Sequence, residues 1–250
     1  MTLELPIGAL PQAGAGGGAE SPVSLSTLAY RWPALEEALL TLQHQAGAVP
    51  GASEAAVPGA IPQPGPKLAS TLLFFLSALG SGEIGRWLGG QAMQTLRNAG
   101  RNNLLTRLGQ DFGQMSRLAE SASGDWRLFF IPLWDGNQAH QIRLFVRHGP
   151  HDEHGQGDDP EDDSTRFVLE VELSRVGDLQ LDGLVRGKRF DLILRTRAPM
   201  PETMRRDITQ IFHDANEATG YKGNIGFQAS GDWHLMPIQG TDTAASNLVV

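Results

Sequence analysis

The stretch that decides the fold is "RFVLEVELSRVGDLQLDGLVRGKRFDLILR", residues 166–195. Apolar and polar side chains alternate along it, and two short turn sequences interrupt the alternation. Because successive side chains of a strand point to opposite faces of a sheet, the pattern predicts strands with one apolar and one polar face. Phe167 and Leu169 share the apolar face with Phe190 and Leu192, two strands later. The stretch therefore predicts an antiparallel meander packed on one side.

Two more strands are predicted before this meander. Residues 126–133, "WRLFFIPL", and 140–147, "HQIRLFVR", have the same period of two. The turn between them contains Asp135 and Gly136, a pair that suits a tight hairpin. These segments add an N-terminal hairpin to the sheet.

A helix is predicted after the meander, at residues 201–219. Pro201 suits a first helical turn, and Gly220 suits the C-terminal cap. The apolar residues recur at helical spacing and predict a buried stripe. They are Met204, Ile208, Ile211, Phe212 and Ala215. The following "NIGFQAS" returns as a strand, so we expect an α+β fold. Its helical N-terminal region precedes an antiparallel or mixed sheet, β-β-loop-β-β-β-α-β, with one covering helix.

Composition divides the chain into four parts. Glycine, alanine and proline dominate residues 1–65, which predicts a flexible region with one short helix at about 33–46. Residues 66–122 are predicted to be helical, in segments 67–79, 83–98 and 101–120. Residues 123–238 form the α+β domain, with an acidic disordered loop at 149–165, and 239–250 form a flexible tail. The apolar run at 68–79 predicts a buried helix.

The charge distribution argues against nucleic-acid and membrane partners. The net charge is -8, and residues 151–163 hold seven carboxylates without Lys or Arg. Residues 166–250 carry ten basic and eleven acidic side chains, which is no basic footprint for nucleic acid. The longest apolar run has 12 residues, too few to cross a bilayer. The N-terminus lacks the basic and apolar parts of a secretion signal, so we expect a cytoplasmic protein without membrane insertion.

The sequence gives little support for a metal, a cofactor or catalysis. His148, His151 and His154 are weak candidates for metal ligands, but their acidic segment has the composition of a solvated loop. Cysteine is absent, and no hydrolase, P-loop or dinucleotide fingerprint occurs. We therefore expect no cofactor, no catalytic residue and no enzyme activity.

Basic side chains on strand ends and on the early helix are the candidate partner-binding residues. They are Arg186, Lys188, Arg189, Arg195, Arg197, Arg205 and Arg206. With the polar face of the sheet, they form the surface that we expect a partner to contact. An RNA platform would need exposed aromatic side chains, whereas Phe167 and Phe190 fall on the apolar face as core residues.

The run from "LEVELSRVGDLQLDG" to "NIGFQ", within residues 166–230, resembles the C-terminal domain of flagellar hook-length control proteins. The shared pattern is an apolar strand, a turn ending at Gly177, two alternating strands, a helix and Gly220 before the last strand. The resemblance implies a non-enzymatic regulator whose flexible N-terminal part is exported through the flagellar secretion channel. Its C-terminal domain would contact the cytoplasmic domain of the export gate and switch export from hook to filament substrates.

Other functions remain open at this point. A protein-interaction module outside flagella would have the same alternating sheet, and an RNA-binding or a metal-binding domain is a further alternative.

Overall fold

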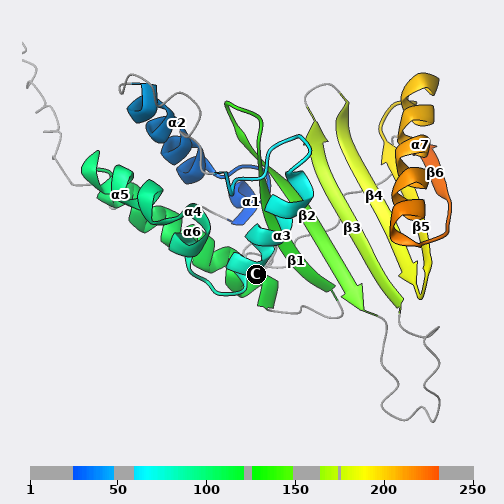
Figure 1. The fold of residues 1–250 in the computed structure, drawn as a ribbon, viewed down its shortest axis with the longest axis horizontal. Coiled ribbons are helices and arrows are strands. Elements are labelled where there is room, and N and C mark those ends of the chain that lie inside the picture. Colours follow the sequence, from blue (N-terminus) through cyan, green and yellow to red (C-terminus); the bar gives the residue numbers. More distant parts are fainter. Residues whose placement is uncertain (1–24, 48–58, 121–125, 149–163, 174–175, 231–250) are drawn as a thin grey trace, which may run out of the picture.

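The computed structural model describes residues 25–47, 59–120, 126–148, 164–173 and 176–230. It has the predicted α+β class, with helices at one end of a single sheet and one further helix at the other (Figure 1). The helices are α1 (Leu25–Leu28), α2 (Pro33–Gly47), α3 (Leu68–Leu79), α4 (Ile84–Leu88), α5 (Gly90–Asn98), α6 (Asn102–Glu120) and α7 (Glu202–Thr219). The strands are β1 (Trp126–Trp134), β2 (Ala139–His148), β3 (Ser164–Leu173), β4 (Gly177–Arg186), β5 (Arg189–Thr196) and β6 (Ile225–Ala229).

The six strands lie side by side in sequence order. Strands β1 to β5 pair antiparallel, each with the next strand along the chain. Strand β6 pairs parallel to β5, since α7 carries the chain back along the sheet between them. The predicted succession of strands and the last helix along the chain is confirmed, and of the two predicted kinds of sheet the mixed one is observed.

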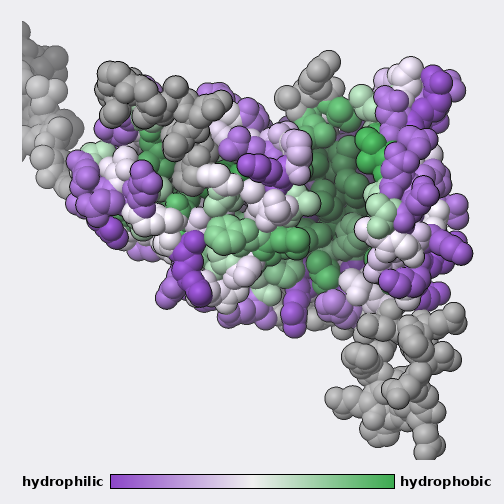
Figure 2. Space-filling model, viewed as in Figure 1, coloured by the Kyte–Doolittle hydropathy of each residue, from purple (hydrophilic) through white to green (hydrophobic). Residues whose placement is uncertain are grey.

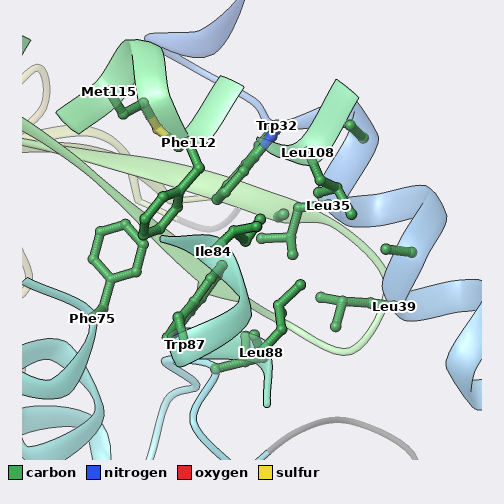
Figure 3. Close-up of a cluster of buried hydrophobic side chains, with 14 of the residues drawn as sticks. Trp32, Leu35, Leu39, Phe75, Ile84, Trp87, Leu88, Leu108, Phe112 and Met115 are labelled. Carbon is green, nitrogen blue, oxygen red and sulfur yellow. The ribbon is translucent and has the colours of Figure 1, made fainter. Parts of the chain in front are cut away.

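The main core lies between the helices and the β1–β2 end of the sheet, and aromatic rings form its centre (Figure 3). Trp32 stacks on Trp87 with ring centroids 5.7 Å apart, and Phe75 and Phe112 pack against the same pair. The indole Nε1 of Trp32 donates a hydrogen bond of 2.9 Å to Asp111 Oδ2. Burial raises the pKa of the Asp111 carboxyl above its usual value, against the lowering effect of this bond.

Helix α2 is the short helix predicted at about 33–46, but it belongs to this core and is not part of a flexible region. Leu35 and Leu39 have no exposed surface. Glu36 accepts a hydrogen bond from the backbone nitrogen of Ala139 in β2, so the helix is also tied to the sheet. Residues 1–24 and 239–250, and most of the acidic loop predicted at 149–165, lie outside the described residues.

Two helical predictions need correction. The segment predicted at 83–98 is divided into α4 and α5 at Gly89, whose φ of 82° lies in the left-handed region. Helix α3, predicted to be buried, exposes Leu73 and Phe74. The helix is apolar on almost every side, so packing against the core covers only part of its surface.

Helix α7 keeps its predicted ends but not its predicted stripe. Gly220 caps it in the left-handed conformation. Of the five apolar residues expected in the interior, Phe212 is buried and Ile208 is half-buried, while Met204, Ile211 and Ala215 are exposed. Helix α7 therefore rests on the sheet along one narrow line of residues, and most of the sheet extends beyond it (Figure 1).

Within the part of the chain that the structure describes, no helix combines the length and the hydropathy needed to cross a bilayer.

Candidate functional site

The strand register sorts the side chains of the sheet onto two faces. The apolar face carries α7, because Phe190 on this face contacts Phe212, with ring centroids 5.3 Å apart. Pairing of Leu181 with Leu169 and of Leu169 with Leu144 extends this face across β4, β3 and β2. The intervening residues of each strand form the opposite, polar face.

The centre of the apolar face is hollowed and open. We call this area the trough and define it by seven half-buried apolar side chains of β2, β3 and β4 on this face. They are Leu144, Val146, Phe167, Leu169, Val171, Leu181 and Val185. Figure 2 shows the trough as a recessed apolar area between the N-terminal helices and α7.

A close contact between neighbouring strands shapes the floor of the trough. Phe167 of β3 lies flat over Gly183 of β4, and a Cβ atom at Gly183 would overlap the phenyl ring. The Phe167 ring also contacts Phe190, at 6.0 Å between centroids, and Phe190 contacts Phe212 of α7. A row of aromatic rings therefore links the floor of the trough to the helix beside it.

Both helices that flank the trough have exposed apolar side chains. Leu73 and Phe74 of α3 are 69% and 46% exposed, and Ile211 of α7 is 68% exposed. Figure 2 shows apolar surface that continues from the trough toward the helices on its left. Such contiguous apolar surface is uncommon on a monomer unless it binds something.

On the polar face, side chains at the centre of the sheet are bonded to one another, whereas those on the apolar face leave the trough open. A row of directly paired residues crosses five strands, and consecutive members are joined by ion pairs or hydrogen bonds. Its members are Arg143, Glu170, Gln180, Arg195 and Gln228. The distances are 3.2 Å from Arg143 Nη2 to Glu170 Oε2, 2.7 Å from Gln180 Nε2 to Glu170 Oε1, and 2.9 Å from Arg195 Nη1 to Gln180 Oε1. We call these five residues the polar row.

Asp182 adds a second carboxylate beside the polar row. Arg166 donates two hydrogen bonds to it, of 2.9 and 2.7 Å, and Arg195 donates one of 3.0 Å. Burial raises the pKa of Asp182, but the bonds from Arg166 and Arg195 outweigh that effect and hold the pKa below its usual value of 3.8. The carboxylate is thus ionised and fully engaged.

The structure separates the predicted partner-binding residues into two groups at opposite ends of β5. Arg186, Lys188 and Arg189 surround the β4–β5 turn, and Arg189 pairs with Asp191 at 2.6 Å. Arg197, Arg205 and Arg206 lie at the other end, where Arg197 pairs with Asp178 at 3.3 Å. Strand β5 has eight residues, so the two groups lie roughly 20–25 Å apart.

Arg195 differs from the other predicted contact residues because it belongs to the polar row. Its guanidinium binds Gln180, Asp182 and Gln228. The polar face as a contact surface stays a prediction, but the functional groups at its centre bind each other.

Of the three candidate metal ligands, only His148 is described. It is exposed, and its Nδ1 lies 3.1 Å from Thr165 Oγ1. His151 and His154 lie outside the described residues, and among those described no group of His, Asp and Glu is arranged to hold a metal.

A small pocket adjoins the trough, because Val171 of the trough lines it together with His140 of the same face and Arg143 of the polar face. Its volume is about 320 Å³, and its lining includes Tyr30, His140, Arg143 and Asp178. Arg143 lies over the Tyr30 ring and pairs with Glu170, and His140 pairs with Asp135. The side chains of Tyr30, Arg143 and His140 in its lining are thus engaged in internal contacts.

The trough was not predicted from the sequence, although the strands that form it were. Alternation assigns its residues to one face but does not tell how far a helix extends over that face. The only available signal was the ratio of one covering helix to six strands, since one helix covers about two strands.

Comparison with known proteins identified no relative: no family model, no curated protein and no solved structure matches this chain.

Proposed function

We propose that the chain is a non-enzymatic protein-interaction protein that binds a partner polypeptide in the trough. The observation that carries this proposal is the open apolar centre of the sheet. Seven apolar side chains on three adjacent strands remain half-buried there, although strand β5 on the same face is covered by α7. Burial of such surface stabilises a complex by about 25 cal/mol per Å².

The resemblance within residues 166–230 gives this interaction a biological setting. We propose that the partner is the cytoplasmic domain of the flagellar export gate and that binding switches export from hook to filament substrates. The strand order and the left-handed Gly177 and Gly220 support this proposal, because they occur where the family pattern has them.

Calorimetric titration of the full chain with the purified cytoplasmic domain of an export gate tests the proposal. We expect saturable binding that Leu169→Asn weakens about ten-fold, since an amide of similar size removes apolar contact from the trough. Leu40→Asn, at an exposed position of α2 outside the trough, is the matched control and should bind like the wild type.

Deletion of the gene in a flagellated host tests the same proposal in cells. We expect hooks of abnormal length or missing filaments by electron microscopy. Normal hooks and filaments, together with no heat of binding to the gate domain, would reject the flagellar role.

A further inference from the structure

We propose that two copies of this chain pair edge to edge through β6, in antiparallel orientation, so that their two six-stranded sheets become one. This inference goes beyond the proposed function, because β5 and α7 separate the outer edge of β6 from the trough. Three features of the molecule support it: the difference between the two edges of the sheet, the bonding groups of β6, and the position of α7.

The edge at β1 is closed to a further strand. The backbone nitrogen of Trp134 donates a hydrogen bond of 2.8 Å to the Pro62 oxygen, so it points away from β2. Alternate residues of a strand direct their backbone groups the same way, and two residues earlier stands Pro132, which has no N–H to donate. Helices α3 and α6 also contact β1. Prolines and covering segments are devices by which proteins prevent pairing at an edge.

The edge at β6 is open within the described part of the chain, because its neighbour in the sheet is β5 alone. On the inner side, the Asn224 oxygen accepts a hydrogen bond from Leu192, and Ser230 donates one to Thr196. The residues at odd positions between Asn224 and Ser230 direct their N–H and C=O groups away from β5. They are Ile225, Phe227 and Ala229. The strand contains neither proline nor lysine, and its one-to-one register with β5 excludes a bulge.

An antiparallel pair of β6 strands is self-complementary. With a two-fold axis at Phe227, this residue lies opposite its own copy and Ile225 lies opposite Ala229, so all three exchange hydrogen bonds with the other copy. Phe227 and Ile208 of α7 pack against the same cluster, which contains Leu194. The side chains at these odd positions therefore lie on the face that carries α7, and the two copies form apolar cross-strand pairs there.

The position of α7 favours a second copy over an isolated extended peptide. The helix contacts β6, and its Phe212 contacts Phe190 of β5, so it lies above these two strands at the edge of the molecule (Figure 1). In the proposed pair, the α7 of the other copy would lie about two strand spacings away, which is about 10 Å. Packed helices have their axes 8–10 Å apart. A second copy would therefore continue both the sheet and the helical layer.

The side of α7 that would meet its copy is polar and balanced in charge. Helical spacing places four side chains on one side of α7, about 60–120° around the helix from Phe212. They are Glu202, Arg206, Thr209 and His213. A right-handed β5–α7–β6 crossover turns this side toward the β6 edge. Each copy brings one carboxylate and one guanidinium, so the helices meet without net charge at the rim of the contact.

Single cysteines test the register, because the chain has no cysteine of its own. Phe227→Cys lies opposite its copy, with Cα atoms about 5.5 Å apart, which is within the span of a disulfide. Ile225→Cys is the matched control on the same strand and face. Its copy lies four residues away along the pair, about 13 Å, which is too far for a disulfide. We expect oxidation of the full chain with diamide to link the first variant and not the second, as seen by electrophoresis without reducing agent.

Sedimentation equilibrium of the full chain tests the pairing without a cross-link. We expect a reversible dimer that Ala229→Pro weakens about ten-fold, because the variant loses its outward N–H in both copies and keeps the bonds to β5. Ala229→Ser keeps the N–H and should dimerise like the wild type. Circular dichroism checks that Ala229→Pro is folded, and the cysteine pair decides the matter if it is not.

Three results would overturn the inference. They are a monomer at every concentration, equal cross-linking of the two cysteine variants, and a dimer that Leu169→Asn dissociates while folded Ala229→Pro leaves it intact. Binding of the gate domain is a separate readout, since Ala229→Pro should bind it like the wild type. Pairing through β6 without any binding of the gate domain would leave this inference standing and reject the flagellar partner.

Discussion

The two faces of the sheet reverse the usual relation between polarity and exposure. On the polar face, Glu170 has no exposed surface and Arg143 is 5% exposed, and each member of the polar row binds its neighbours. On the apolar face, Phe167 and Leu169 of the same strand remain half-buried. Buried charges are tolerated when paired and hydrogen-bonded, whereas open apolar surface is retained where a partner uses it. The comparison shows that the polar face holds the internal bonds of the sheet, whereas the apolar face is the one to which we propose that a partner binds.

Removal of one partner from the polar row should have the largest effect on stability. Glu170→Leu leaves the buried Arg143 guanidinium without its carboxylate, and we expect a loss of about 3–5 kcal/mol in the free energy of unfolding. Urea denaturation followed by circular dichroism measures it.

A double variant checks whether this loss comes from the unpaired charge. Arg143→Met together with Glu170→Leu removes both charges and should recover most of the stability, since apolar pairs often replace buried ion pairs at little cost. If the double variant is less stable than Glu170→Leu alone, the row does not act as a buried ion pair.

The second prediction makes one substitution on each face of β3. Val168 is 4% exposed on the polar face, and Val171 is half-buried on the apolar face. Val168→Leu adds volume where the packing is closed and should cost about 1–3 kcal/mol. Val171→Leu adds it beside the open trough and should change stability by less than about 0.5 kcal/mol.

Thermal unfolding of the two variants under the same conditions gives the comparison directly. Equal losses would mean that the two faces are packed alike, and the trough would then be closed in solution.

Local patterns predicted the elements of the sheet well. The period of two between residues 126 and 195 gave five strands in the observed order, and Gly220 gave the end of α7. These features depend on neighbours in the chain, so the sequence contains the information directly.

Features that depend on distant residues were not predicted. The helix at about 33–46 was predicted, but its participation in the core depends on Trp32 meeting Trp87 and Phe112, which are distant in the sequence. The exposure of Ile211 likewise depends on where α7 lies on the sheet. The trough likewise depends on contacts between distant residues, because it lies where α7 does not cover the sheet.

The smallest expected effect concerns pH and the carboxylate beside the polar row. Burial raises the pKa of Asp182, and Arg166 and Arg195 lower it further than burial raises it, so its folded-state pKa lies below the unfolded value of about 3.8. Its stabilising contribution is therefore present above that value and is lost as the pH falls through the folded-state pKa.

Asp182→Asn removes this contribution. The wild type should thus lose stability relative to the variant as the pH falls from about 5 to below the folded-state pKa. Asp111, whose pKa is raised by burial, has the opposite trend, but it is present in both proteins and cancels in the difference. Urea midpoints at several pH values measure the two curves, and parallel curves would show that the polar face does not hold Asp182 as an ionised, paired group.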